Sequence, residues 1–386
     1  RKKTCTVLRE EKRPVPLYPI FLHPSGCLHP FLDGKKAGPA VCEFLKKDTF
    51  RHRGSHRPPD YAGIIRILER FNLLPAIFFL KSRAECDTAL SCRHGLTPMK
   101  DNEAFTDDLY DLLDRFPTLG SHRQIKALRS AGLAAHHGGQ LPAWKLLVEE
   151  MMNRGHLRVI FATSTIAAGV NFPARTIVLF NSDQFNGHDF APLTATEFRQ
   201  MTGRAGRRGQ DNIGFMLAIA GRFMDLGHIR KMLSAAPEDI LSQLKNDFAM
   251  VLNLLLSQTP ADVKNIFERS FAAWQQNSIE GETSSAAALL WKDFSLHLEF
   301  LQREGFVEKS GRLTEDGRWA SRLRLDYPLL VAECLRKNAF PEDNERLLAA
   351  VVAVFAYDRD DEIQPALKER PHKLTSALRK MLLAVR

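Results

Sequence analysis

The stretch TATEFRQMTGRAGRRGQDNIG, residues 194–214, carries the most specific pattern in the chain. It opens on Thr194 and Glu197, a T-x-x-E capping box that predicts the start of a short helix. A turn follows in which arginines alternate with glycines. Glycine lets a backbone approach a ligand closely, and arginine guanidinium groups match pairs of phosphate oxygens. The composition predicts a polyphosphate site, and the alternative is a solvated basic turn.

The residues of this turn that could contact phosphate are Gly203, Arg204, Gly206, Arg207, Arg208 and Gly209. With Gln200 three residues ahead, the spacing Q-x-x-G-R-x-G-R resembles motif VI of superfamily-two helicases. The longer string QMTGRAGRRG-x-D is similar to the superkiller (Ski-like) DExH RNA helicases. The resemblance implies that Arg204 and Arg207 stabilise transition-state charge at the γ-phosphate of ATP, and that Gln200 orients water or phosphate.

Composition indicates an ordinary globular protein. The chain has 386 residues, which predicts two or three domains, and 44% of them are hydrophobic and 26% charged. No apolar run approaches the roughly 18 residues of a membrane helix, and no signal peptide is seen. These features predict a cytoplasmic protein. Six cysteines occur without a C-x-x-C pair, so neither a zinc site nor a disulfide framework is indicated.

Positive charge is concentrated at the start of the chain. Residues 1–62 hold 13 Lys and Arg against 6 Asp and Glu, so they carry most of the net charge of +9. They also hold eight of the 20 prolines. The segment is either a phosphate-binding arm or a solvated connector. Its RPVPL string, residues 13–17, resembles the family's passage into the second RecA-like domain, and the first residue, Arg1, suggests that the sequence starts inside a longer protein.

Helices and short apolar strands alternate from Tyr61 onward. The predicted buried strands are 76–80, 132–137, 158–162, 175–180 and 214–219. This alternation predicts an α/β fold with one doubly wound parallel sheet over residues 60–225. Any nucleotide-binding or small-molecule α/β domain would give the same pattern. The order of the motifs is what favours a RecA-like helicase domain.

Lys81, Ser82 and Arg83 follow the first of these strands. Ligands of open α/β sheets bind at the carboxyl ends of strands, which makes these residues candidates for a phosphate contact. The position resembles helicase motif IV, and the resemblance implies that Ser82 and Arg83 touch the nucleic-acid backbone. Taken alone, Ser82 is better explained as a helix N-cap.

A second motif is the string ATSTIAAGVNFPA at residues 162–174. A helix N-terminus after a strand offers amide groups to an anion, and threonine hydroxyls add donors. The string resembles motif V, which implies that Thr163 and Thr165 hold a nucleic-acid phosphate. It also implies that Gly169 and Asn171 face the nucleotide. The family's RNA-decay members commonly have an acid and a methionine where this chain has Ser164 and Ala168, so an archaeal-type DNA-repair helicase stays an alternative.

Two adjacent histidines, His136 and His137, invite a metal hypothesis. Neighbouring residues on a strand point to opposite faces, and no third ligand is suitably spaced. We therefore predict no metal site in this chain.

The sequence after residue 225 reads as mostly helical. One predicted helix starts at Thr259-Pro260, with a buried face formed by Val263, Ile266, Phe267, Phe271 and Trp274. Another helix around Trp291 and Phe294, a hairpin with a turn at Ser310-Gly311 and a helix begun by Thr314 suggest a winged-helix domain, which the family has here. The polar linker near 276–285 has no room for the family's arch insertion.

The predicted domains are a basic, proline-rich leading segment that includes part of the first strand (1–59), the second RecA-like domain (60–225), a helical connector with a winged helix (226–345) and the start of a helical domain (346–386). No G-x-x-x-x-G-K-[ST] loop or DExH acid occurs. The resemblance thus implies that ATP and magnesium are held mainly by a first RecA-like domain elsewhere in the full-length protein, and that this part alone is inactive.

The resemblance implies the C-terminal half of an ATP-dependent, 3′ to 5′ helicase that acts on a single strand, RNA rather than DNA, as a monomer. Two alternatives stay open. One is a non-enzymatic nucleic-acid-binding module derived from a helicase, and the other is a DNA-repair helicase of the same superfamily.

Overall fold

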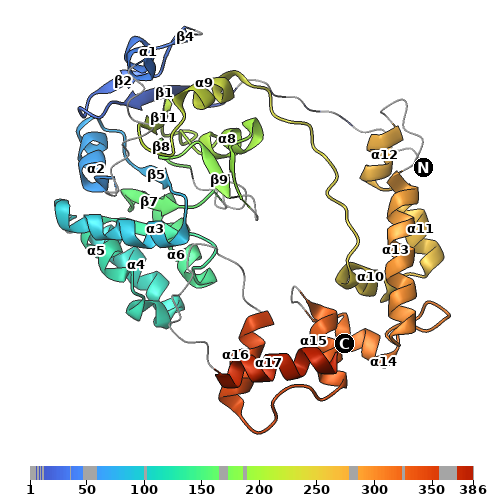
Figure 1. Cartoon of the computed structure of the whole chain (residues 1–386). Coiled ribbons are helices and arrows are strands. Elements are labelled where there is room, and N and C mark those ends of the chain that lie inside the picture. Colours follow the sequence, from blue (N-terminus) through green and yellow to red (C-terminus); the bar gives the residue numbers. More distant parts are fainter. Residues whose placement is uncertain are drawn as a thin grey trace. The chain divides into compact units, whose positions relative to one another are not determined.

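The computed structural model describes residues 6, 8, 10, 13–34, 36–46, 59–99, 102–164, 173–185, 189–277, 286–323, 327–355 and 372–385. The chain divides into two compact units, residues 1–238 and 239–386. Figure 1 shows strands gathered in the first unit and helices alone labelled in the second.

A seven-stranded sheet forms the centre of the first unit. Its order is β2-β1-β11-β8-β5-β7-β6, and every pairing is parallel except that of β2 with β1. The strands are β1 (Leu17–Leu22), β2 (Leu28–Pro30), β5 (Ala76–Phe79), β6 (Leu133–His136), β7 (Val159–Ala162), β8 (Thr176–Leu179) and β11 (Gly214–Ile219). Two short hairpins stand outside it, β3 (Leu32–Asp33) with β4 (Lys36–Ala37) and β9 (Asp183–Phe185) with β10 (Phe190–Pro192). The predicted α/β fold with a parallel sheet is confirmed.

The helices of the first unit are α1 (Pro39–Lys46), α2 (Tyr61–Arg70), α3 (Arg83–Ala89), α4 (Glu103–Arg115), α5 (Ile125–Ala131), α6 (Pro142–Asn153), α8 (Ala195–Thr202) and α9 (Leu226–Ser234). Alternate residues of each strand enter two separate cores. Ile77 and Phe79 of β5 pack in one core, whereas Ala76 and Phe78 pack in the other. Both faces of the sheet are therefore covered, which is why its strands are apolar throughout rather than alternating.

Helix α6 shows how periodicity produces this packing. Its side chains Trp144, Leu147, Val148 and Met151 repeat at helical spacing and are all fully buried. Pro142 occupies its first turn, where a missing N–H costs nothing. This helix has the buried stripe that the sequence predicts.

The second unit is helical. It contains α10 (Phe248–Leu255), α11 (Pro260–Glu268), α12 (Phe271–Asn277), α13 (Ala286–Arg303), α14 (Glu315–Ala320), α15 (Pro328–Arg336), α16 (Glu345–Phe355) and α17 (His372–Ala384). An antiparallel bridge joins Val307 to Leu313 around Gly311, whose φ is +85°. The turn lies where the sequence predicts one.

One predicted helix starts at Thr259-Pro260 as expected, but its predicted extent is wrong. The run from Thr259 to Trp274 is not continuous, because α11 ends at Glu268 and Ser270 accepts a hydrogen bond from Ala273 N at the start of α12. Only two of its five predicted core residues, Val263 and Phe267, are buried. The other three are exposed by 42–63%: Ile266, Phe271 and Trp274.

No helix within the described ranges is long and apolar enough to span a membrane.

Candidate nucleotide and nucleic-acid sites

The arginine-rich turn lies at the amino ends of the central strands. Helix α8 begins with the predicted capping box of Thr194 and Glu197 and ends at Thr202. Directly afterwards, Ala205 forms a parallel bridge with Ala174, which precedes β8. The carbonyl of Arg204 accepts from Ala174 N at 2.9 Å. The turn is thus fixed to the amino edge of the sheet.

Glycine is required at two positions of this edge. Gly206 has φ +85°, and a Cβ there would stand 2.4 Å from Val15 Cγ1. A Cβ on Gly214, the first residue of β11, would stand 2.5 Å from the carbonyl carbon of Ala205. Any side chain at either position would push the turn away from the sheet.

Arg13 fastens the leading segment to this turn. Its guanidinium donates to the carbonyl of Thr202 at 2.9 Å and also to the carbonyl of Ala205, and its Nε donates to Val15 O at 2.7 Å. Burial lowers the pKa of Arg13. These bonds join residues 13–15 to the end of α8, where the Thr202 carbonyl also accepts from Ala205 N at 3.0 Å.

Asp211 holds two arginines. Its side chain is 1% exposed and accepts from Arg207 Nε at 2.8 Å and Nη2 at 3.0 Å, and from Arg175 Nε at 2.8 Å. Burial by itself raises the pKa of this carboxyl group. The hydrogen bonds from the Arg207 side chain and backbone and from Arg175 outweigh that effect and lower the pKa to about 2. The carboxylate therefore sets the plane of the Arg207 guanidinium.

The remaining predicted residues of the turn lie close by. Gln200 is exposed on the last turn of α8, and Gly203 caps that helix. Arg204 is half-buried, and burial lowers its pKa, whereas Arg208 is exposed. Guanidinium groups held on a backbone that glycine brings close suit a polyphosphate.

The predicted strand-binding residues lie at the opposite, carboxyl edge of the sheet. Ser82 follows β5 and caps α3 by accepting from Glu85 N at 3.0 Å. Arg83 is the first residue of α3, and its guanidinium passes beside Gly138, where an added Cβ would lie 3.5 Å from Nη2. Thr163 follows the adjacent strand β7. The structure groups these residues together and separates them from the arginine turn by the length of the strands.

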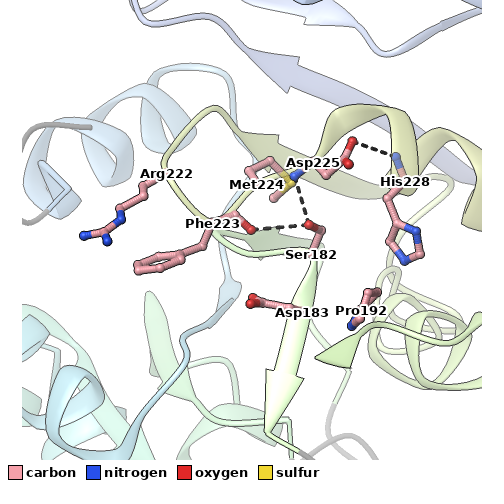
Figure 2. A pocket seen from close by; sticks show the side chains of 8 residues that line it. All are labelled: Ser182, Asp183, Pro192, Arg222, Phe223, Met224, Asp225 and His228. Atoms are coloured by element: carbon pink, nitrogen blue, oxygen red, sulfur yellow. Dashed lines mark hydrogen bonds between the residues drawn. The ribbon is translucent and has the colours of Figure 1, made fainter. Parts of the chain in front are cut away.

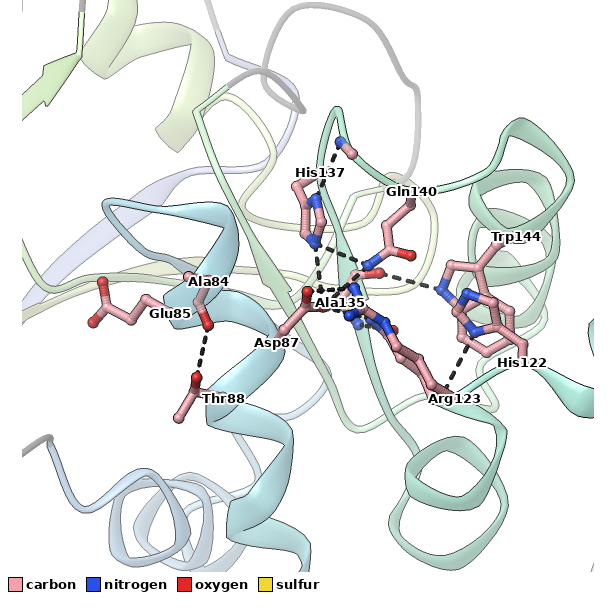
Figure 3. A network of polar contacts seen from close by, with 12 residues as sticks. Ala84, Glu85, Asp87, Thr88, His122, Arg123, Ala135, His137, Gln140 and Trp144 are labelled. Atoms are coloured by element: carbon pink, nitrogen blue, oxygen red, sulfur yellow. Dashed lines mark hydrogen bonds and ion pairs between the residues drawn. The ribbon is translucent and has the colours of Figure 1, made fainter. Parts of the chain in front are cut away.

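A polar network around Asp87 supports this carboxyl edge (Figure 3). Asp87 is on α3, and its Oδ1 contacts Gln124 Nε2 at 2.8 Å, Gln140 Nε2 at 3.1 Å and His137 Nε2 at 3.2 Å, while Oδ2 accepts from Arg123. Burial lowers the pKa of His137, although Asp87 opposes that effect. The network ties α3 to the residues that follow β6.

The two histidines have different partners. His136 Nε2 contacts Glu149 Oε1 at 2.9 Å, whereas His137 contacts Asp87. Among the described residues, no three His, Cys, Asp or Glu side chains are grouped to hold a metal ion.

Lys81 connects the carboxyl edge to a hollow beside it. Its Nζ lies 2.8 Å from Asp183 Oδ2 and stands 4.0 Å and 3.9 Å from the ring centroids of Phe190 and Phe223. The hollow has a volume of about 300 Å³ and lies between the residues that follow β8 and those that follow β11. Figure 2 shows Phe223 and Asp183 among its lining residues.

Three predicted residues, Thr165, Gly169 and Asn171, lie outside the described residues. Sequence reasoning also missed three residues that the fold places beside these candidate site residues: Asp211, Arg13 and Asp87. Asp211 and Arg13 belong to the strings GRRG-x-D and RPVPL and could have been found there. Nothing in the sequence marks Asp87 except its position one helical turn after Arg83.

Comparison with known families matches two parts of the chain. Residues 114–209 match the helicase conserved C-terminal domain, and residues 310–386 match the DSHCT (NUC185) domain.

Three relatives illustrate the similarity. The probable helicase HelY of Mycobacterium tuberculosis is 37% identical over 239 residues, which cover 58% of this chain and 26% of the relative. Human superkiller complex protein 2 is 33% identical over 242 residues, covering 60% and 19%. The human exosome RNA helicase MTR4 is 28% identical over 299 residues, covering 71% and 28%. In each case the match spans less than a third of the relative's length.

Proposed function

This chain belongs to the superkiller-like branch of the DExH helicases and contains their helicase C-terminal domain, and on that premise we propose that it is the C-terminal half of an ATP-dependent RNA helicase that moves 3′ to 5′. The observation that carries the proposal is the division of polar residues between two edges of one sheet. A translocating motor needs a nucleotide site and a strand site that move together, and a rigid sheet connects the two.

The amino edge is the proposed nucleotide side. Arg204 and Arg207 contact the γ-phosphate, and Gln200 orients the water or phosphate. The family resemblance assigns three further residues to this side of the nucleotide site: Gly203, Gly169 and Asn171. ATP supplies a transferable phosphoryl group and, with magnesium, is held mainly by a first RecA-like domain. The arginines contribute positive charge where negative charge develops, which is electrostatic rather than covalent catalysis.

The carboxyl edge is the proposed strand side. Ser82 and Thr163, with Thr165, donate hydroxyl or backbone hydrogen bonds to phosphates, and Arg83 adds a charged contact. Such contacts position a strand without reading its sequence. These contacts therefore do not distinguish RNA from DNA. The choice between the two substrates depends on other contacts.

We also propose that the second unit begins with a winged-helix domain, whose wing is the Val307 to Leu313 turn, and continues into the helical domain predicted from residue 346. The wider predictions of a monomeric protein in the cytoplasm stay predictions. One relative, 35% identical over 214 residues, is named a chloroplastic RNA helicase of Arabidopsis thaliana.

Strand-stimulated ATPase assays on the full-length protein test the proposal. RNA oligomers are expected to raise the turnover of ATP more than DNA oligomers of the same sequence. Greater stimulation by DNA would favour the DNA-repair alternative. Tight strand binding without any ATP turnover would favour a non-enzymatic module and would overturn the proposed activity.

A further inference from the structure

The hollow at the carboxyl edge adjoins the proposed strand site. One wall comes from Ser182 and Asp183, which follow β8, and the other comes from Arg222 and Phe223, which follow β11. Strand β5 is the neighbour of β8 in the sheet and leads into Lys81, which reaches into both walls. The hollow therefore extends the row of residues formed by Ser82, Arg83 and Thr163.

The walls are held together by hydrogen bonds. Ser182 N donates to Phe223 O at 2.9 Å, and Asp225 N donates to Ser182 Oγ at 2.9 Å. On the far side, His228 Nε2 contacts Leu193 O at 2.7 Å. Because these bonds join the chain after β8 to the chain after β11, the hollow is preformed rather than a gap between loose loops.

The lining combines an aromatic face with polar groups (Figure 2). Phe223 is 47% exposed although it is a large apolar side chain. Lys81 Nζ stands 3.9 Å from its ring centroid, and the Arg222 guanidinium carbon stands 5.2 Å away. An exposed ring with arginine beside it is the arrangement on which nucleic-acid bases stack.

Asp183 adds a hydrogen-bond acceptor. Its Oδ2 lies 2.8 Å from Lys81 Nζ and can accept a second hydrogen bond, because the side chain is 26% exposed. Its Oδ1 is buried and is not the oxygen that a base would contact. A carboxylate oxygen accepts from N–H groups, and every base carries such a donor on its edge.

We propose that this hollow binds one base of the single strand, stacked on Phe223 with its N–H edge toward Asp183. The inference rests on the proposed function, since Ser82, Arg83 and Thr163 must hold the backbone that delivers the base. It adds a contact of a different kind, because stacking needs a base whereas the backbone contacts need only phosphate.

Comparing strands with and without bases distinguishes base stacking from the contacts to phosphate. The full-length protein is titrated, by fluorescence anisotropy, with oligouridine and with an abasic ribose-phosphate strand of equal length. Phe223→Ala is expected to weaken oligouridine binding about tenfold and to leave abasic binding unchanged. Phe223→Trp keeps an aromatic face and is expected to restore the affinity for oligouridine.

Phe71 provides a matched control. It follows an arginine, as Phe223 does, with Arg70 at 5.8 Å from its ring centroid, and it is 55% exposed. It precedes β5, however, and so lies at the amino edge. Phe71→Ala should bind both strands as the wild type does.

Two results would overturn the base site. In the first, Phe223→Ala binds oligouridine with wild-type affinity. In the second, it loses equal affinity for both strands, which would indicate a change in the fold or in the backbone contacts. If the wild-type protein binds neither strand, the proposed function itself fails and the base site fails with it.

Discussion

The two edges of the sheet are built in different ways. At the amino edge, the arginine turn is held by buried charge. Asp211 binds Arg207 and Arg175, and Arg13 binds the carbonyl groups of Thr202 and Ala205. At the carboxyl edge, Ser82 and Arg83 lie at a helix N-terminus, and Asp87 supports that helix through mostly neutral partners. At the amino edge, the guanidinium groups of Arg207 and Arg175 are thus held in fixed orientations. The carboxyl edge instead presents hydrogen-bond donors that can exchange one phosphate for another. A nucleotide transition state needs the first property, and a moving strand needs the second.

Removal of one of the two arginines proposed to contact the γ-phosphate should have the largest effect. Arg204→Ala in the full-length protein is expected to lower strand-stimulated ATP turnover about 10³-fold, because it removes charge that stabilises the transition state. Strand affinity, measured by anisotropy, should not change. Arg208→Ala, an exposed neighbour, serves as the control. Normal turnover in Arg204→Ala would refute the assignment of the amino edge.

Removing the carboxylate at the amino edge should cost stability. Asp211→Ala leaves Arg207 and Arg175 without their shared partner, and we expect the free energy of unfolding to fall by about 3 kcal/mol. Urea denaturation followed by circular dichroism measures this change. Asp211→Asn keeps the shape and part of the hydrogen bonding, so its loss should be smaller. Equal stability of Asp211→Ala and wild type would show that the two arginines need no anchor.

The same carboxylate predicts a pH dependence. The pKa of Asp211 falls from 3.8 to about 2 in the folded protein, so its contribution is complete above pH 3.8 and disappears as the pH falls toward 2. The shift corresponds to about 2 kcal/mol. Urea midpoints measured across this range should drop more steeply for the wild type than for Asp211→Asn. Parallel curves would contradict the assignment.

At the carboxyl edge the effect should be moderate and dependent on salt. Arg83→Gln is expected to weaken strand binding about tenfold and to lower the slope of log K against log salt by about 0.7. ATP turnover at saturating strand should stay near the wild-type value. An unchanged salt slope would mean that Arg83 does not contact a phosphate.

The smallest effect tests the helix that joins the two edges. Thr194 caps α8 near the carboxyl edge, and α8 ends at the arginine turn. Thr194→Ala should reduce the free energy of unfolding by about 1 kcal/mol without changing ATP turnover when strand and ATP are saturating. Thr194→Ser keeps the cap and should match the wild type. A large loss of ATP turnover in Thr194→Ala would show that α8 couples the two edges during turnover and does more than position the arginine turn.

The sequence predicts the strands well, because a doubly covered parallel sheet leaves short apolar runs between helices. The predicted strand 76–80 is observed as β5 and the predicted strand 214–219 as β11. The break before Phe271 was not predicted. Apolar periodicity continues across it, but Phe271 and Trp274 stack on each other at 5.5 Å on the surface. Ser270 was the available signal, as an N-cap.

The candidate site was predictable only where its residues are neighbours in sequence. Arg204 and Arg207 belong to one motif. The contact of Arg13 with Thr202, 189 positions away, depends on β1 pairing with β11. The hollow beside Phe223 likewise forms only because the segments that follow β5, β8 and β11 meet. Such placements are set by sheet order, which local patterns do not contain.

Sheet order also limits how this protein can be divided. The matched helicase domain, residues 114–209, contains β6, β7 and β8. In the sheet, β5 lies between β7 and β8, and β8 has β11 on its other side. An expressed fragment with those limits would have two strands separated by an empty position. It would lack 13 of the 31 buried residues of one core and 17 of the 25 buried residues of the other. A fragment meant to fold by itself should instead run from before Arg13 to Glu238. Domain swaps between relatives should respect the same limits, since β1 and β2 belong to the sheet.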